Sequence, residues 1–216
     1  MNTLTTTDLT AALQWRYATK SFDAEKKIPA PTFEALISAL QLSPSSFGLQ
    51  PWKFFVIENT DVRDQLRQQS WNQPQVTDAS HLIVLAAKET ITAADIHEWI
   101  ECLAKAQSTP IEQLAPLQGM ITQFTGAMSL DDMQHWNSRQ VYIALGQLMT
   151  SAAVMGVDSC PLEGISATAY DKILTLEGSG YRTLVACALG YRSEHDKYAT
   201  VPKARFPLEK IVTVIA

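Results

Sequence analysis

The sequence contains few cysteines, and nothing in their spacing suggests a disulfide framework. The three residues Cys102, Cys160 and Cys187 are an odd number and form no CxxC pair. Two of them lie in apolar runs that are typical of strands. We therefore expect the cysteines to be buried, reduced and structural, as in a cytoplasmic protein.

Long apolar runs and clusters of basic residues are also missing. The longest apolar segment, residues 141–156, contains Gln147, Thr150 and Ser151 and is shorter than the roughly 18 residues of a membrane span. The opening "MNTLTTTDLT" has neither a basic start nor an apolar run, so it does not resemble a secretory signal. The chain has 17 basic and 22 acidic residues, a net charge of -5. Neither membrane anchoring nor nucleic-acid binding is expected.

Several catalytic and nucleotide-binding motifs are absent from the sequence. It contains no GxGxxG, no phosphate-binding P-loop and no GxSxG. The stretch "HEWIEC" that begins at His97 is not the HExxH zinc motif, and His81, His135 and His195 have no second ligand at helical spacing. The sequence thus predicts neither a metal site nor a nucleophile elbow.

The pattern of apolar residues favours one α+β domain over residues 1–216. Of these residues, 46% are hydrophobic, which is enough for a sizeable core, and strands and helices are mixed without regular alternation. Strands are expected at 53–58, 81–87, 157–160, 183–191 and 210–216, and helices at 8–16, 31–40, 60–66 and 140–155. Leu9, Ala12 and Leu13 of the first helix are expected to face inward, and Asn59 or Thr60 is expected to cap the helix at 60–66. Residues from about 90 to 134 are expected to form a helical insertion. The helix at 140–155 is apolar on nearly all sides, as in a core or an interface.

Four basic residues are candidates for binding a phosphate group. Arg16 and Lys20 lie in "RYATK", and Lys203 and Arg205 lie in "PKARFP". In an extended segment, the side chains of Lys203 and Arg205, two residues apart, would point to the same face. Arg and Lys side chains that converge on one place suit a phosphate monoester. The alternative is that all four are solvated surface cations.

Two polar loops adjoin predicted strands. "SPSSFGLQPWKFFVIE" begins as a helix-breaking loop at Ser43 and runs directly into a core strand, and "CPLEGIS" follows a short strand at Cys160. Loops on a rigid scaffold often contain functional residues, and glycine permits close approach of backbone to a ligand. Each loop is also compatible with an ordinary connection or turn.

Taken together and in order, these segments resemble the FMN-dependent nitroreductase family. The matching motifs are "RYATKSFD", "SPSSFGLQPWKFFVIE", "WNQPQVTDASHLIV", "GVDSCPLEG" and "LGY…VPKARFPLEKIV". They span nearly the whole chain from Arg16 onward, apart from the region between about 90 and 134. The resemblance implies an α+β fold with a mostly antiparallel central sheet flanked by helices. It also implies an intertwined homodimer in which the C-terminal strand packs on the partner.

The same resemblance implies a set of FMN contacts at the dimer interface. The phosphate would be bound by Arg16, Lys203 and Arg205, helped by Tyr17 and Ala18 of the same loop as Arg16. The flavin ring would have Lys20 and Asn72 at its edge, the amides of Glu163 and Gly164 near N5, and Pro161 and Leu162 packed on it. The other subunit would supply Pro44, Ser45 and Ser46, and Gln50 would support that loop.

Three positions depart from the family pattern. Ala18 stands where a small hydroxyl is frequent, Gly48 where some members have a flavin-contacting asparagine, and Gln75 where some members have a second lysine near the ring. None of these departures removes the predicted phosphate site. Phe124 and Ile121 are candidate lid residues over the substrate.

The resemblance implies an oxidoreductase that passes electrons from NAD(P)H, through FMN, to a nitroaromatic, quinone or similar conjugated small molecule. Because the flavin supplies the redox chemistry, no acid or base side chain is required for hydride transfer. Two alternatives remain: a flavin-binding dimer that acts as a carrier or sensor, and an enzyme of the same fold that uses oxygen.

Overall fold

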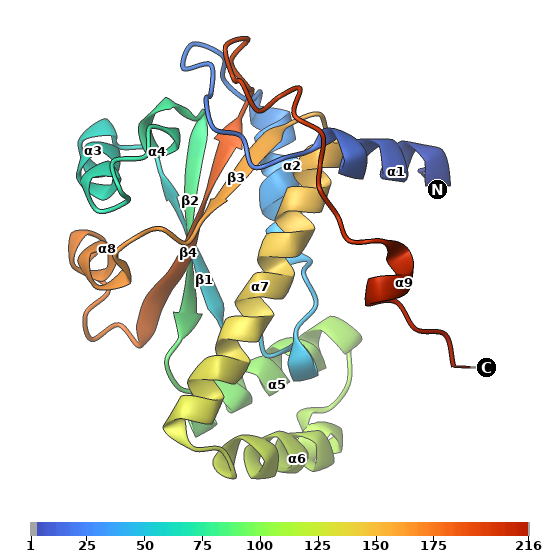
Figure 1. Cartoon of the computed structure of the whole chain (residues 1–216). Helices are drawn as coiled ribbons and strands as arrows, with labels where there is room; N and C mark the ends of the chain where they lie inside the picture. Colours follow the sequence, from blue (N-terminus) through green and yellow to red (C-terminus); the bar gives the residue numbers. More distant parts are fainter. Residues whose placement is uncertain (1–3, 216) are drawn as a thin grey trace.

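The computed structural model describes residues 4–215, and its centre is an antiparallel sheet (Figure 1). The strands are β1 (Trp52–Ile57), β2 (His81–Lys88), β3 (Asp158–Leu162) and β4 (Tyr181–Gly190). Their order is β1-β2-β4-β3, and every neighbouring pair is antiparallel. This confirms the expected α+β class and four of the five predicted strands.

Helices cover both faces of the sheet. The remaining elements are α1 (Thr6–Trp15), α2 (Ala30–Gln41), the 3-10 turn η1 (Ser46–Gly48), α3 (Thr60–Gln68), α4 (Gln75–Asp78), α5 (Ala93–Gln107), the 3-10 turn η2 (Ile111–Leu114), α6 (Ala115–Gly126), α7 (Leu130–Val154), α8 (Ala167–Ile173) and α9 (Leu208–Ile211). Helices α2 and α7 pack on one face, whereas α3, α4 and α8 pack on the other. Because both faces are covered, the central strands β2 and β4 are almost continuously apolar.

Alternate residues of β2 point into the two layers of the core. Ile83 and Leu85 pack with Leu148 of α7, and Leu82 and Val84 pack on the opposite face. The two-residue period of a strand places successive side chains on opposite faces. Helix α7 is the long apolar helix predicted from 140–155, and it begins earlier because Ser129 caps it by accepting a hydrogen bond from the Asp132 amide.

Residues 90–134 form the expected helical insertion, with α5, η2 and α6. Its own small core consists of Ile96, Ile100 and Ile121. In Figure 1 these helices lie at the end of the sheet opposite to the segment that follows α1. Within the described residues, no helix is long and apolar enough to cross a membrane.

The C-terminal tail differs from the prediction. A strand was expected at 210–216, but α9 ends at Ile211 and no strand follows through Ile215; Ala216 lies outside the described residues. Val212 has extended backbone, with φ -126° and ψ 125°. A strand requires a neighbouring strand to satisfy its backbone groups, and residues 4–215 of one chain provide none for this segment.

Two further expectations require correction. Leu9 and Leu13 of α1 were expected to face inward, yet both are exposed, and no described residue of this helix is buried. Cys160 and Cys187 are buried as expected, but Cys102 is exposed on α5. The hydrophobic period therefore identified helix α1 correctly, but its apolar side is not covered within a single chain.

Helix α5 begins with a reciprocal capping arrangement centred on Asp95. Its carboxylate accepts hydrogen bonds from the Thr92 amide (2.7 Å) and hydroxyl (2.8 Å), and it also forms an ion pair with Lys88. Burial opposes ionisation of Asp95, but the hydrogen bonds from Lys88 and Thr92 outweigh it and lower the pKa. The carboxylate thus joins the insertion to the end of β2.

Replacing Asp95→Asn should lower the free energy of unfolding by about 1–2 kcal/mol at pH 7, because the cap and the ion pair are weakened. The pKa of Asp95 is lower in the folded protein than in the unfolded chain, where it is 3.8. The stabilisation is therefore fully present at a pH above 3.8 and is lost as the pH falls through the pKa of the folded protein. Urea unfolding at pH 7 and in acid measures both effects. Asp64→Asn, an exposed change on α3, is the control. Equal stability of Asp95→Asn and the wild type at pH 7 would contradict the assignment.

Candidate functional site

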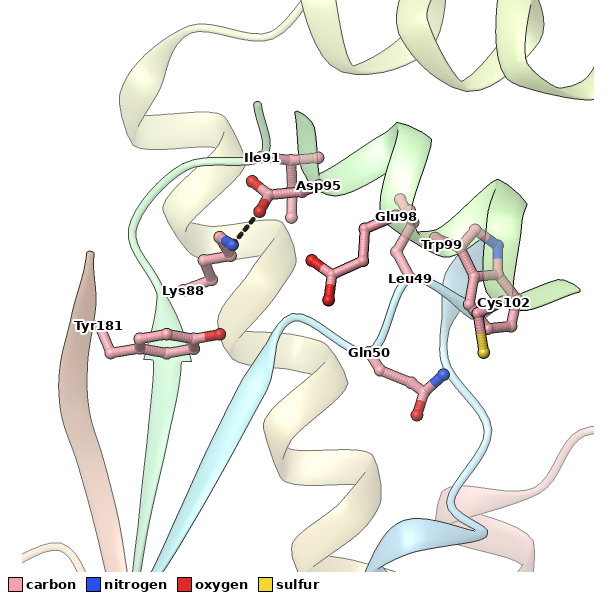
Figure 2. A pocket seen from close by; sticks show the side chains of 9 residues that line it. All are labelled: Leu49, Gln50, Lys88, Ile91, Asp95, Glu98, Trp99, Cys102 and Tyr181. Carbon is pink, nitrogen blue, oxygen red and sulfur yellow. Dashed lines mark hydrogen bonds and ion pairs between the residues drawn. The ribbon is translucent and has the colours of Figure 1, made fainter. Parts of the chain in front are cut away.

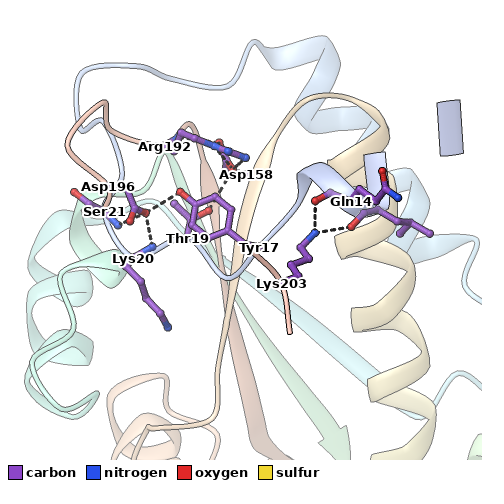
Figure 3. Close-up of polar contacts among 10 residues, drawn as sticks. Gln14, Tyr17, Thr19, Lys20, Ser21, Asp158, Arg192, Asp196 and Lys203 are labelled. Atoms are coloured by element: carbon purple, nitrogen blue, oxygen red, sulfur yellow. Dashed lines mark hydrogen bonds and ion pairs between the residues drawn. The ribbon is translucent and has the colours of Figure 1, made fainter. Parts of the chain in front are cut away.

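Three cations gather where the C-terminal segment crosses the end of α1. The Lys203 ammonium donates to the carbonyl oxygens of Leu13 (2.7 Å) and Gln14 (2.5 Å), as Figure 3 shows. Carbonyl groups at a helix C-terminus attract cations, so α1 fixes this lysine. Arg16 follows α1 directly, and Arg205 lies two residues beyond Lys203.

The charge of this cluster is not neutralised within the described chain. Among residues 4–215, no carboxylate forms an ion pair with Arg16, Lys203 or Arg205. The Nε atom of Arg16 is buried and has no hydrogen-bond partner. Burial, followed by the positive charges of Arg16, Arg205 and Arg192, lowers the pKa of Lys203. An uncompensated group of this kind is suited to a phosphate.

A second polar region, formed by Lys20, Gln75 and Cys160, lies next to the cations. Gln75 is only 4% exposed, and its Oε1 atom has no hydrogen-bond partner. Burial raises the pKa of the Cys160 thiol, and the opposing influences come from Lys20, Gln75 and Arg16. Lys20 and Gln75 therefore both lie near the Cys160 thiol, and among the described residues the buried Oε1 atom of Gln75 accepts no hydrogen bond.

Asn72 lies in a tight turn whose most prominent residue is Trp71. Both residues have left-handed backbone, with φ 50° at Trp71 and 56° at Asn72. The indole is 83% exposed and lies directly over Gly164, where an added Cβ would be 2.7 Å from the ring. Gln73 donates to the Gly164 carbonyl at 3.2 Å. A glycine is therefore necessary at 164 if Trp71 is to cover this backbone.

The analysis of the sequence missed Trp71 as a candidate site residue. The only signal was its position directly before Asn72 in "WNQPQ". A single exposed apolar side chain is not unusual by itself. Its location over Gly164, in the motif expected to approach the flavin, makes Trp71 a candidate apolar wall of the site.

Strand β3 is longer than predicted and orients the "CPLEG" motif. It extends to Leu162, which is buried in the core, whereas Pro161 is partly exposed. Successive strand residues face opposite sides, so Pro161 is available for a ligand and the Leu162 side chain is not. Glu163 is exposed and accepts a hydrogen bond from the Tyr142 hydroxyl of α7 at 2.5 Å. Burial and this contact raise the pKa of Tyr142 to about 12.

The loop from Pro44 to Gln50 is strained and internally bonded. Phe47 and Gln50 have left-handed backbone, at φ 53° and 47°. The Ser45 hydroxyl accepts from the Gln50 amide, and the side chain of Gln140 accepts from the Ser46 amide, both at 2.9 Å. The expected role of Gln50 in supporting this loop agrees with its additional bond to the Gly48 carbonyl at 3.1 Å.

Gly48 is fixed by a tryptophan of the insertion. Its φ is +72°, and an added Cβ would be 2.4 Å from the ring of Trp99. The asparagine found in some family members has no space here. The departure at this position therefore has a packing reason that the sequence did not reveal.

The loop and the cation cluster lie at opposite ends of the sheet. Figure 1 shows η1 beside α5, whereas the segment after α1 lies at the other end of the molecule. The structure thus brings Arg16, Lys20, Gln75, Lys203 and Arg205 toward one region. It does not bring Pro44, Ser45 and Ser46 to that region within a single chain.

The two candidate lid residues have different surroundings. Phe124 is partly exposed and packs edge-on against Phe47, with 5.2 Å between ring centres. Ile121 is fully buried in the core of the insertion. A direct contact between an acceptor and Ile121 is therefore not available in this structure.

A cavity of about 250 Å³ lies between the loop and the insertion (Figure 2). The ion pair of Lys88 and Asp95 is at one side, and Gln50, Trp99 and Cys102 are at the other. Among residues 4–215, no three His, Cys, Asp or Glu side chains are grouped as metal ligands. The cavity lies on the insertion side of the molecule, away from the cation cluster.

The fold is α+β with an antiparallel sheet, and the cation cluster is its candidate site for an anion. The family model described as "Nitroreductase family" matches residues 13–191, and the chain belongs to this family. A relative from Staphylococcus haemolyticus, named "Putative NAD(P)H nitroreductase", is 35% identical over 93% of this chain and 94% of its own length. This confirms the resemblance seen in the motifs.

Solved structures share the fold at low sequence identity. One from Exiguobacterium sibiricum, described as a "putative nitroreductase in complex with FMN", has a TM-score of 0.83 at 21% identity and covers 99% of this chain and 100% of that chain. The gut-bacterial enone reductase CLA-ER has a TM-score of 0.80 at 20% identity, covering 99% and 100%. These similarities confirm the nitroreductase-like fold.

A double-mutant cycle tests the packing of Trp99 on Gly48. Gly48→Asn should destabilise the protein by more in the wild-type background than in Trp99→Ala, because removing the indole makes room for the new side chain. We expect a coupling energy of about 1–2 kcal/mol from urea unfolding. Additive effects of the two substitutions would show that the ring does not determine this position.

Proposed function

We propose that this protein is an FMN-dependent oxidoreductase that passes electrons from NAD(P)H to a conjugated small molecule. The observation that supports this most directly is the uncompensated cluster of Arg16, Lys203 and Arg205. Three cations with a buried unpaired Nε atom suit the single terminal phosphate of FMN. The family membership and the FMN complex of the Exiguobacterium sibiricum structure point the same way.

The other polar atoms of the site fit the rest of such a cofactor. The unpartnered Oε1 of Gln75 can accept a hydrogen bond from the ring edge, and Lys20 can place positive charge there. Asn72 adds a further polar side chain at this edge. When bound, FMN supplies the two-electron chemistry, so the chain needs no catalytic acid or base.

The surrounding residues orient the cofactor and limit access to it. Tyr17 and Ala18 continue the phosphate-binding loop, and the backbone amides of Glu163 and Gly164 would lie near the reactive ring atom. Pro161 would pack on one side of the ring, and its neighbour Leu162 would support it from the core. Trp71 of one chain and Phe124 on the insertion of the second copy would form apolar walls for a flat acceptor.

The active form in this proposal is a homodimer. The 3-10 turn η1, which begins at Ser46, lies beside α5 and opposite to the segment that follows α1, so a second copy would have to supply this loop to the cleft. The apolar side chains of α1 and of the tail, including Leu13, Ile211 and Val214, are exposed in one chain. Pairing of the tail with a partner strand would cover its unpaired backbone.

The acceptor class follows from the walls of the site. Flat nitroaromatics, quinones and enones can stack between aromatic residues, and CLA-ER is described as an enone reductase. The three free thiols fit a reducing compartment, so we place the protein in the cytoplasm. A carrier or sensor without turnover and an oxygen-using enzyme are the alternatives that an assay must separate.

Anaerobic turnover tests the proposed function. The protein is loaded with FMN and mixed with NADH or NADPH, and menadione, a nitrofuran and an enone are compared as acceptors. The proposal predicts that NAD(P)H oxidation requires both bound FMN and an acceptor. FMN-loaded protein that oxidises no NAD(P)H with any acceptor would favour a carrier or sensor. NAD(P)H oxidation that occurs only when oxygen is admitted would favour an enzyme of the same fold that uses oxygen.

Arg205→Ala should weaken FMN binding more than Lys203→Ala. Among residues 4–215, the Arg205 guanidinium donates only to the neighbouring Ala204 carbonyl, so it is free to form two parallel bonds with a phosphate, whereas Lys203 is a point charge partly used by α1. A lost charge-assisted bond corresponds to roughly tenfold or more in the dissociation constant. Fluorescence titration with FMN gives the constants, and an unchanged value for Arg205→Ala would reject the assignment.

Gln75→Lys should raise the midpoint potential of bound FMN by tens of millivolts. A unit charge about 5 Å away contributes roughly 3 kcal/mol at an effective dielectric near 20, and about 30 mV corresponds to 1.4 kcal/mol for two electrons. Lys20→Gln should lower the potential. Gln68→Lys, on the exposed face of α3, is the control. An anaerobic redox titration that shows no shift for Gln75→Lys with FMN bound would place this residue away from the ring.

A further inference from the structure

A buried carboxylate with no part in the proposed electron transfer lies behind the phosphate-binding loop. Asp196 is 5% exposed. Its Oδ2 atom accepts three hydrogen bonds, from the Tyr17 hydroxyl (2.9 Å), the Lys20 amide (2.8 Å) and the Ser21 amide (3.0 Å). Its Oδ1 atom accepts a fourth from the Tyr198 amide at 2.9 Å.

These bonds join two segments that are far apart in the sequence. One segment contains Arg16 and Lys20, and the other leads from Asp196 through Tyr198 to Lys203 and Arg205. Figure 3 shows the carboxylate beside the loop, with its bonds to the loop drawn as dashed lines. Asp196 is therefore hydrogen-bonded to the loop that follows Arg16 and is covalently continuous with the segment that contains Lys203 and Arg205.

A second buried carboxylate braces the same loop from behind. Asp158 accepts from the Arg192 guanidinium, with its closest contact at 2.6 Å from Nη2, and from the Thr19 hydroxyl at 3.2 Å. The guanidinium lies 4.2 Å from the ring centre of Trp15 and 4.6 Å from that of Tyr17. Because Asp158 already neutralises Arg192, this arginine positions the loop and is not a free phosphate ligand.

The ionised state of Asp196 opposes the binding of an anion nearby. Burial acts against ionisation, but the hydrogen bonds from Tyr198, Ser21 and Lys20 outweigh it and lower the pKa. A negative charge beside a phosphate site would weaken binding by repulsion if that charge were its only influence. The geometry of four accepted hydrogen bonds gives it a different role.

We propose that Asp196 is a positioning residue that assembles the phosphate site by tying the Arg16–Lys20 loop to the segment that contains Lys203 and Arg205. This inference rests on the proposed function, because it assumes that the site binds FMN. It goes beyond that function in assigning the assembly of the site to a residue that does not touch the cofactor. Its specific consequence is that Asp196 acts on recognition of the phosphate, not on the flavin ring.

The decisive comparison is FMN against riboflavin, which lacks the phosphate. Asp196→Asn keeps the shape but cannot accept at both atoms, because its NH2 group must face either the loop donors or the Tyr198 amide. We expect FMN affinity to fall by roughly tenfold or more, whereas riboflavin affinity changes far less. The ratio of the two affinities, measured by fluorescence titration, is therefore predicted to fall.

Three results would overturn the inference. Unchanged affinities for both FMN and riboflavin would show that Asp196 does not act on the phosphate site. Equal weakening of both ligands would indicate a general structural role. Tighter FMN binding by Asp196→Asn would show that the residue acts only by repulsion.

Asp171→Asn is the matched control. Asp171 accepts a 2.8 Å hydrogen bond from the Thr183 amide near the start of β4, so this variant loses a bond of the same kind away from the cations. Its affinity ratio should equal that of the wild type, and a fall as large as that of Asp196→Asn would count against the proposal. Thermal unfolding without FMN shows that each variant is folded.

Tyr17→Phe keeps the proposal testable if Asp196→Asn does not fold. It removes one of the four bonds and leaves the carboxylate charged, so a smaller fall in the affinity ratio is expected and an unchanged ratio would contradict the proposal. Wild-type protein that binds no FMN would refute the proposed function itself. Wild-type protein that binds FMN, with no change in the ratio for the variants, would refute only the role of Asp196.

Discussion

The gathering of Arg16, Lys203 and Arg205 without a carboxylate partner is the constraint on which the site depends. Like charges at close range repel one another, so the protein has to hold them with other contacts. The carbonyl groups of Leu13 and Gln14 near the end of α1 bind Lys203, and in our proposal the three hydrogen bonds from Asp196 to the loop after Arg16 hold the other side. The phosphate of the proposed cofactor would relieve the repulsion among these cations.

The sheet provides the rigid support for this arrangement. Strand β3 ends at Leu162, so Pro161 and Glu163 are fixed relative to the loop that contains Ala18, which forms a bridge with Ser159. Because helices cover both faces of the sheet, the side chains of β2 and β4 contribute to the apolar core on each face. Loops placed on such a scaffold can be strained, as Trp71 and Asn72 are, without loss of the surrounding structure.

Much of the fold was predictable because local patterns agreed with the tertiary structure. The helix at 31–40 follows from hydrophobic periodicity, the strand at 81–87 follows from a short continuous apolar run, and the Asn59 cap marks the start of α3. The tail could not be predicted in this way. Its apolar residues satisfy a strand pattern, but a strand also needs a neighbouring strand, and periodicity does not show where that neighbour comes from.

The structure brings Arg16, Lys203 and Arg205 near one another. The order of the motifs named these three residues as candidates for the site. It could not show that Trp99 fills the space beside Gly48, that Trp71 lies over Gly164, or that Leu162 faces the core. These facts depend on contacts between segments far apart in the chain. The buried position of Ile121, in contrast to its expected role as a lid, has the same origin.

The central claim is that each FMN site combines the cations of one chain with residues 44–46 of another. A heterodimer of two differently tagged variants tests this most directly: one chain has Arg16→Ala and Arg205→Ala, and the other has Ser46→Trp. If the site is shared, one of its two clefts is intact, and the account predicts one tightly bound FMN per heterodimer, with almost none in either homodimer. If each site belonged to a single chain, both clefts would be defective, and a heterodimer without FMN would contradict the account.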